Sequence, residues 1–111
     1  MSDLNERAAK ALGWEWTERG EKGGIFYEAF WTKPDGSTFD FPFEPDKDIA
    51  QAWMLVDEVV YKRDMAFWLK QTDKGWWSCK IESWRGHVRH GADTAPLAIT
   101  RACVKALEAE R

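Results

Sequence analysis

Apolar residues recur at intervals of three or four near the start of the chain, as they do on one face of a helix. These residues are Leu4, Ala8, Ala11 and Leu12. Asp3 and Glu6 stand three positions apart, which is the spacing of a capping box at a helix N-terminus. Gly13 has the left-handed conformational freedom that helix C-termini use. We therefore expect a helix that Asp3 caps and that ends before Gly13.

A second helical pattern begins after Asp48, whose side chain suits an N-cap, and continues to about Arg63. Asp57 and Glu58 fall on the side opposite the apolar residues, so we expect both to face solvent. The apolar positions of this predicted helix are Ile49, Ala52, Trp53, Val56, Val59 and Val60.

A third helix is predicted close to the end of the sequence. Asp93 or Thr94 would cap it, and Pro96 suits its first turn because the missing N–H has no helical partner there. Arg101 and Lys105 are four positions apart and would form a basic pair on the outside of the helix. The apolar positions are Leu97, Ile99, Ala102, Cys103, Ala106 and Leu107.

Bulky residues on either side of a turn predict a β-hairpin in the first half of the chain. Residues 25–31 are rich in aromatic side chains, as strands prefer, and Pro34-Asp35-Gly36-Ser37 is a strong turn sequence. Residues 38–41 alternate between apolar and polar side chains, as a strand with one buried face does. The residues that would share one face are Phe39, Phe41 and Phe43. Residues 14–24 contain three glycines, and we expect them to form turns.

Three more strands are expected between the second and third helices. Residues 65–70 and 76–81 are joined by Asp73-Lys74-Gly75, a tight turn with glycine at a left-handed position. A third strand at residues 84–90 is interrupted by Gly86. Alternation in the middle strand predicts that Trp77, Cys79 and Ile81 face inward. It predicts that Trp76, Ser78 and Lys80 face outward.

The predicted order of elements is α-ββ-α-βββ-α. Strands joined by tight turns are antiparallel, and an antiparallel sheet covered by helices is an α+β domain. We therefore expect one domain over residues 1–111, in which three helices cover an antiparallel sheet of about five strands as an α/β/α sandwich. A chain of 111 residues is long enough for one hydrophobic core.

The charge of the chain limits its partners. It has 16 basic and 19 acidic residues, a net charge of −3, whereas proteins that bind nucleic acid in general carry a basic surplus. The distribution is uneven, because residues 1–60 carry 13 acids and 6 bases whereas residues 61–111 carry 6 acids and 10 bases. We expect no general nucleic-acid binding, but the second half has the charge to hold a local anion.

The cysteines and the lack of long apolar runs indicate a cytoplasmic setting. The sequence opens without a secretory leader and contains no apolar run that could span a membrane, so we expect a cytoplasmic protein. Cys79 and Cys103 lie far apart and lack zinc-finger spacing. We expect both thiols to be reduced and buried as small apolar groups.

Tryptophan is unusually frequent, with eight in 111 residues. A core of this size does not enclose eight indoles completely, and each indole N–H requires a hydrogen-bond acceptor. We expect at least five of the rings to fill the core and the others to line a pocket or an interface with another molecule.

Catalytic and metal-binding patterns are weak. His87 and His90 would face opposite sides of a strand, which disfavours a shared metal ion. Cys79 is predicted to face inward, which disfavours a thiolate paired with either histidine. Glu28 and Asp40 could lie across the first hairpin, but an acidic pair there is more typical of a solvated face than of acid–base catalysis. We expect no catalytic residue, no metal and no cofactor.

Aromatic and basic residues gather in the second half of the chain. Indole rings stack on planar bases, arginine holds phosphate with two hydrogen bonds, and a helix N-terminus favours anions. This combination predicts a site for a small anionic, nucleotide-like ligand. The predicted site residues are Trp76, Lys80, Trp84, Arg85, His87, Arg89 and Thr94.

Several segments resemble the phage ABA-sandwich domain family. The clearest is Asp93-Thr94-Ala95-Pro96-Leu97-Ala98-Ile99 followed by Arg101-Ala102, which is similar to the closing motif of that family. The resemblance implies an α/β/α sandwich from tailed phages or prophages, without an established enzymatic role. The basic stretch with two histidines at residues 85–90 departs from the family pattern. Weaker similarities are found in Leu4-Asn5-Glu6 with Leu12-Gly13-Trp14, in Asp48-Ile49-Ala50-Gln51-Ala52-Trp53, and in Gly75-Trp76-Trp77-Ser78-Cys79.

The leading hypothesis is a non-enzymatic phage or prophage accessory protein that binds a small nucleotide-like anion. It would sequester a signal of host defence in the host cytoplasm, as a homo-oligomer. A second hypothesis is a protein-interaction module that inhibits a host defence or regulatory complex, with surplus tryptophans at the interface. A third is a small nucleotide-processing enzyme that uses His87 or His90. A role in the virion or its assembly is a fourth.

Overall fold

The computed structural model describes residues 3–39, 42–72 and 74–110. Its helices are α1 (Asp3–Ala11), α2 (Ile49–Asp57) and α3 (Ala95–Ala109), and the π-helical turn η1 (Glu58–Lys62) continues α2. The strands are β1 (Glu15–Arg19), β2 (Glu28–Thr32), β3 (Thr38–Phe39), β4 (Ala66–Gln71), β5 (Trp77–Ser83) and β6 (Gly86–Ala92).

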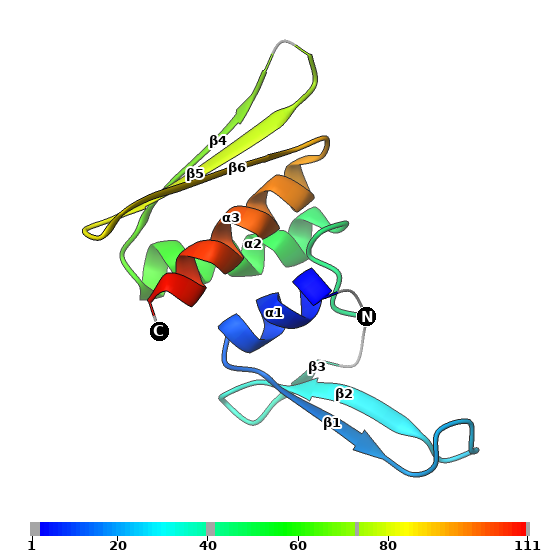
Figure 1. Cartoon of the computed structure of the whole chain (residues 1–111). Helices are drawn as coiled ribbons and strands as arrows, with labels where there is room; N and C mark the ends of the chain where they lie inside the picture. Colours follow the sequence, from blue (N-terminus) through cyan, green and yellow to red (C-terminus); the bar gives the residue numbers. More distant parts are fainter. Residues whose placement is uncertain (1–2, 40–41, 73, 111) are drawn as a thin grey trace.

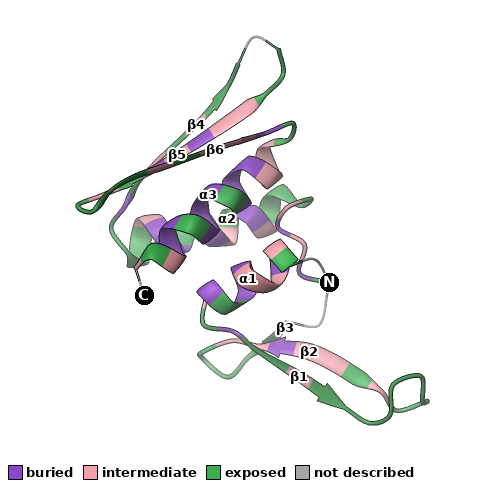
Figure 2. Cartoon of the chain, viewed as in Figure 1, coloured by how far each residue is buried: buried purple, intermediate pink, exposed green. Residues whose placement is uncertain are grey.

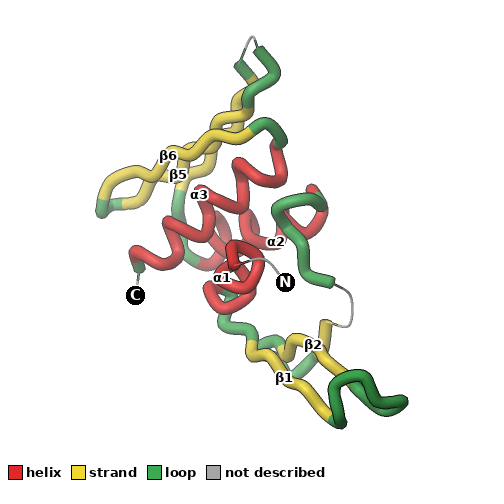
Figure 3. The backbone as a smooth tube through the Cα atoms, turned by 45° about the vertical axis from the view of Figure 1, so that its right-hand side comes forward, coloured by secondary structure: helices red, strands yellow, loops and turns green. Residues whose placement is uncertain are grey.

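The strands form two separate antiparallel sheets of three strands each. One sheet has the order β1-β2-β3 and the other the order β4-β5-β6. The helices lie between these sheets (Figure 1), and the view turned by 45° shows the same layering (Figure 3). The molecule is elongated, with extents of 49 × 31 × 18 Å.

The α+β class is therefore confirmed, whereas the single sheet of about five strands and the α/β/α layering are wrong. The difference arises from β1, which lies in the glycine-containing segment that was predicted to form only turns. All five of its residues pair with β2, from Glu15 opposite Thr32 to Arg19 opposite Glu28. With this third strand, the first hairpin becomes a sheet of its own on the far side of the helices.

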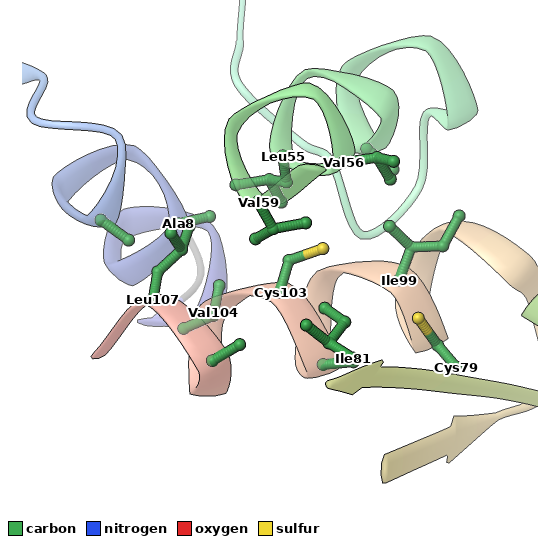
Figure 4. Packing of buried hydrophobic residues seen from close by; sticks show 14 of the residues in the cluster. Ala8, Leu55, Val56, Val59, Cys79, Ile81, Ile99, Cys103, Val104 and Leu107 are labelled. Atoms are coloured by element: carbon green, nitrogen blue, oxygen red, sulfur yellow. The ribbon is translucent and has the colours of Figure 1, made fainter. Parts of the chain in front are cut away.

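Helix α3 is the centre of the core. It contacts α1, α2, β5 and β6, so it is buried on several sides. Figure 2 shows the buried residues concentrated along the helices. Figure 4 shows apolar side chains of α3 between those of α2–η1 and those of β5. The fully enclosed members include Leu55, Val59, Ile81, Ile99, Cys103, Val104 and Leu107.

The helix boundaries follow from local hydrogen bonds. The Asp48 carboxylate accepts hydrogen bonds from the N–H groups of Ala50 and Gln51 at 2.9 and 3.2 Å, which confirms the predicted N-cap. At α3 the cap is Thr94, whose Oγ1 accepts from the Leu97 N–H at 3.4 Å. Asp3 lies within α1 instead of capping it.

The predicted solvent side of the second helix is wrong at Glu58, which is only 8% exposed. The helix widens there into the π-helical turn, in which the Arg63 N–H donates to the carbonyl of Glu58, five residues earlier. The same spacing brings the Arg63 guanidinium to 3.1 Å from the Glu58 carboxylate, which compensates its burial. Ile49 and Trp53, predicted as apolar core positions, are 49% and 46% exposed.

The first hairpin also differs from its prediction. Strand β2 begins at Glu28, and the preceding Ile25 and Phe26 lie in an exposed loop. Phe39 and Phe43 pack against Trp14, with ring centroids 5.3 and 4.6 Å from it. The predicted partners Asp40 and Phe41 lie outside the described residues, as does Asp73 of the second turn.

The expectation that at least five tryptophans fill the core is wrong. Trp14 and Trp31 are buried and Trp77 is half-buried. The exposed tryptophans are Trp16, Trp53, Trp68, Trp76 and Trp84. Trp16 and Trp68 lie on strands, Trp53 lies on α2, and Trp76 and Trp84 lie just outside β5, so exposed indoles on several elements remain available to another molecule.

Candidate functional site

The outer face of the β4-β5-β6 sheet presents aromatic and basic side chains in rows. Strand register pairs Trp68 with Lys80 and Lys80 with Arg89, so these three residues form one row across the sheet. Lys70 and Ser78 form the next row with Gly91. Because cross-strand partners share a face, all these side chains lie opposite the inward-facing Cys79 and Ile81. The inward orientation of Cys79 and Ile81, with Trp77 half-buried beside them, is as predicted.

A shallow depression of about 300 Å³ lies over these rows, and we refer to its lining residues as the basic sheet face: Trp68, Lys70, Ser78, Lys80 and Arg89. Lys80 Nζ is 5.0 Å from the centre of the Trp68 ring and 3.3 Å from a Glu82 carboxylate oxygen. In the described part of the chain, neither Lys70 nor Arg89 is within 4.0 Å of a carboxylate oxygen. Two cations are therefore available to an anionic ligand.

Trp68 and Lys70 were missed by the sequence analysis. The alternation of residues 65–70 indicated a strand, but alternation does not give its register with the neighbouring strand. The strand register places Trp68 opposite Lys80, and Lys80 opposite Arg89, so a tryptophan lies in one row with two cations.

Trp76 lies at one end of the basic sheet face. It precedes β5 and is 49% exposed, and its indole covers Gly91 of β6. A Cβ atom at Gly91 would collide with the Trp76 ring, so the glycine is what allows the indole to approach β6 this closely. Trp76 therefore borders the row of Lys70 and Ser78.

Trp84 and Arg85 lie at the other end, in the turn between β5 and β6. The Arg85 guanidinium is 4.9 Å from the Trp84 ring centre, and its Nη1 donates to the Ala109 carbonyl at 3.0 Å. Arg85 thus bonds to the C-terminal turn of α3. Lys80 is three residues before Ser83, or about 10 Å along the strand, so the turn is separate from the basic sheet face.

His87 and Thr94 occupy different places. His87 is opposite Glu82 on the outer face, one row beyond Lys80 and Arg89. Thr94 is beyond the opposite end of β6, where its hydroxyl caps α3. The structure therefore brings together Lys80 and Arg89, with Trp76 and His87 at the edges. It separates Trp84, Arg85 and Thr94 from them.

The chemistry of the inner face does not favour a nucleophile. His90 is the cross-strand partner of Cys79 and lies on the face opposite His87, as predicted. Burial raises the pKa of Cys79 to about 12 and that of Cys103 well above its ordinary value, so both thiols are protonated near neutral pH. Figure 4 shows both sulfur atoms among apolar side chains. Within residues 3–39, 42–72 and 74–110, no three metal-ligating side chains cluster.

A larger groove, of about 680 Å³, is on the β1-β2-β3 sheet. Its lining includes the apolar Trp31 and Phe39 and the acidic Glu18, Glu44 and Asp46. Lys22 and Lys47 also line it, and Lys47 pairs with Glu44 at 3.5 Å. The acidic surplus makes this groove a poorer site for an anion than the smaller basic sheet face.

The sequence profile of the phage ABA sandwich domain matches residues 8–104. No curated protein and no solved structure matches the chain. None of the described helices has the length and apolar character needed to cross a membrane.

Proposed function

Because the chain belongs to the phage ABA sandwich domain family, we propose that it is a phage or prophage accessory protein that binds a small, planar anion such as a nucleotide. The observation that carries this proposal is the row of Trp68, Lys80 and Arg89 on an open sheet face. The site of action would be the cytoplasm of the host cell, where such a protein would sequester a nucleotide signal of host defence.

The proposed binding mode uses the free cations for phosphate and the indole for the base. Arg89 would hold a phosphate group with two charge-assisted hydrogen bonds, and Lys70 would add a second cation across the depression. Lys80 would move from the Trp68 ring toward the phosphate, which exposes the indole to a stacked base. The predicted residues Trp76 and His87 would border the ligand.

We propose binding without turnover. The basic sheet face offers Ser78 as its only hydroxyl, and no histidine or carboxylate is its cross-strand partner, because Ser78 stands between Lys70 and Gly91. A serine hydroxyl requires an adjacent general base to act as a nucleophile. A hydrolysis assay with the same nucleotides would contradict this part of the proposal if turnover depended on Ser78 or His87.

Isothermal titration with nucleoside monophosphates, cyclic dinucleotides and ADP-ribose tests the binding, with inorganic phosphate as a control for charge alone. Loss of a charge-assisted hydrogen bond costs about 1.5–3 kcal/mol, so Arg89→Ala should weaken binding by about 10- to 100-fold. Lys105→Ala is the control, since it removes an exposed cation from α3. Flat traces with every ligand, or equal affinity of Arg89→Ala and the wild type, would contradict the proposal.

A protein partner is a second candidate function, and a different surface supports it. Ile49 and Trp53 are one helical turn apart on α2 and are about half exposed, and Tyr61 of η1 is 82% exposed. Exposed aromatic residues are enriched among the residues that dominate protein interfaces. A partner captured from host lysate by the wild type but not by Trp53→Ala would support this function, whereas equal capture by both would exclude this surface.

A further inference from the structure

Strand β1 is a free sheet edge. Among the described strands it pairs only with β2, at one end of the order β1-β2-β3, and four of its five residues are exposed. In Figures 1 and 3 no described helix or strand lies beyond it. The backbone groups that a strand directs away from its neighbour are therefore available to another strand.

Natural proteins usually protect such an edge with charged residues, and β1 carries Glu15, Glu18 and Arg19. Charges repel a second strand only when like charges oppose each other. Among the described residues, neither Glu15 nor Arg19 takes part in an ion pair. Whether Glu15 and Arg19 repel or attract another strand therefore depends on the charges of the residues opposite them in that strand.

Symmetry limits the registers in which two copies of β1 could pair. Two identical antiparallel strands in one sheet are related by a two-fold axis perpendicular to the sheet, which keeps every side chain on its own face. The axis must therefore lie midway between one residue and the same residue of the second copy, so that this residue pairs with its own copy. In a five-residue strand, full overlap places it at Thr17, opposite Thr17 of the second copy.

This register is self-complementary. Glu15 lies opposite Arg19 of the second copy, and the two-fold axis repeats this arrangement. The dimer therefore has two Glu15–Arg19 ion pairs on this face of the sheet. On the other face, Trp16 lies opposite Glu18 of the second copy. Within one chain the single N–H of Trp16 already donates to Glu18 Oε1 at 3.0 Å, and Glu18 also hydrogen-bonds the Tyr27 side chain, so the complementarity of this register rests on the two Glu15–Arg19 pairs.

The other sheet edges lack this property. If two copies of β6 paired with full overlap, Arg89 would lie opposite Arg89 of the second copy, and the two like charges would repel. Strand β3 has only two residues. Edge strand β4 carries Lys70 as its single charged residue, so no ion pair forms in any register. Among the described strands, charge complementarity favours β1.

We propose that two copies of this chain associate through antiparallel pairing of their β1 strands, forming a continuous sheet of six strands. The occupant of this edge is thus a second copy of the chain. The basic sheet face lies on the other side of the helical layer and stays open, so the dimer does not depend on the proposed ligand (Figure 1).

A charge-swap experiment tests the register. The masses of the wild type, Glu15→Arg, Arg19→Glu and the double variant are measured by sedimentation equilibrium over a concentration series, and circular dichroism confirms the fold. Each single variant puts like charges opposite each other twice and should weaken dimerisation by about tenfold or more. The double variant should restore it to nearly the wild-type level. A monomeric wild type, or single variants that dimerise as well as the wild type, would overturn the proposal.

Cysteine cross-linking gives a second measurement. Cross-strand partners have Cα atoms about 4.5–5.5 Å apart, within the range for a disulfide, so Thr17→Cys should form an intermolecular disulfide rapidly under mild oxidation. Thr38→Cys is the matched control on the opposite edge of the same sheet. The native Cys79 and Cys103 are buried and do not compete. Equal cross-linking of the two variants would overturn the pairing.

Discussion

Lys80 and Arg89 are direct cross-strand partners on β5 and β6, and both side chains lie on the outer face of the sheet. Like charges in such positions destabilise a sheet. Lys80 is compensated by Glu82 at 3.3 Å and by the Trp68 ring, whereas Arg89 is in no ion pair within the described residues. An arrangement that costs stability and leaves one cation free is the kind expected at a site that receives an anion.

This relationship predicts that Arg89→Gln stabilises the unliganded protein. Removing the charge opposite Lys80 should raise the free energy of unfolding by about 0.2–1 kcal/mol at low salt, and the gain should shrink as salt screens the repulsion. Urea denaturation at two salt concentrations measures both effects. Lys105→Gln, on the exposed side of α3, is the control and should change stability little. Destabilisation by Arg89→Gln would mean that Arg89 has a structural role.

The contact between Trp76 and Gly91 predicts strong coupling between these positions. Gly91→Ala places a Cβ atom inside the indole and should cost about 1–3 kcal/mol of stability. In the background of Trp76→Ala the same substitution should cost much less, because the obstructing ring is gone. A double-mutant cycle by denaturant unfolding measures the coupling. Additive effects of the two substitutions would show that the indole does not rest on Gly91.

The position of Arg85 predicts a role in stability and not in ligand binding. Its guanidinium donates to the Ala109 carbonyl at the end of α3, where cations are favoured by about 0.3–1 kcal/mol. Arg85→Ala should therefore lower the free energy of unfolding by that amount and leave the affinity for a ligand on the basic sheet face unchanged. Titration of this variant beside Arg89→Ala separates the roles. Equal losses of affinity in the two variants would show that Arg85 contributes to binding and would contradict a purely structural role.

Local chemistry made some features of this fold predictable from sequence. The caps at Asp48 and Thr94 depend on residues a few positions away, and the inward direction of Cys79 follows from alternation in one strand. Strand β1 was not predictable in this way, because its charged residues lie between glycines and it is a strand only through its pairing with β2. The burial of Glu58 likewise depends on a helix that widens by one residue.

The candidate site was also predictable only in part, because some of its residues come together only through strand pairing. Lys80 and Arg89 were identified from their composition and neighbourhood in the sequence. The register between β4 and β5 places Trp68 beside Lys80, and the fold of the turn places Arg85 against the end of α3, away from the basic sheet face. Register and turn geometry are tertiary properties that composition does not encode.

The buried thiols predict a loss of stability at alkaline pH. The pKa of Cys79 is raised by burial from its ordinary 9.0 to about 12, and that of Cys103 is raised well above 9.0. The folded state therefore resists forming thiolates that the unfolded state forms readily. This contribution to stability is fully present below pH 9.0 and is lost as the pH rises toward 12, at up to about 1.4 kcal/mol per pH unit for each thiol.

Urea unfolding at a series of pH values from neutral to strongly alkaline measures this loss. Other groups also titrate there, so the control is the Cys79→Ala and Cys103→Ala double variant, which keeps those groups and lacks the thiols. The free energy of unfolding should fall more steeply with pH in the wild type than in the double variant, with the curves diverging above pH 9.0. Parallel curves would show that the thiols ionise equally well in the folded and unfolded states, and thus that the core around α3 admits water to them.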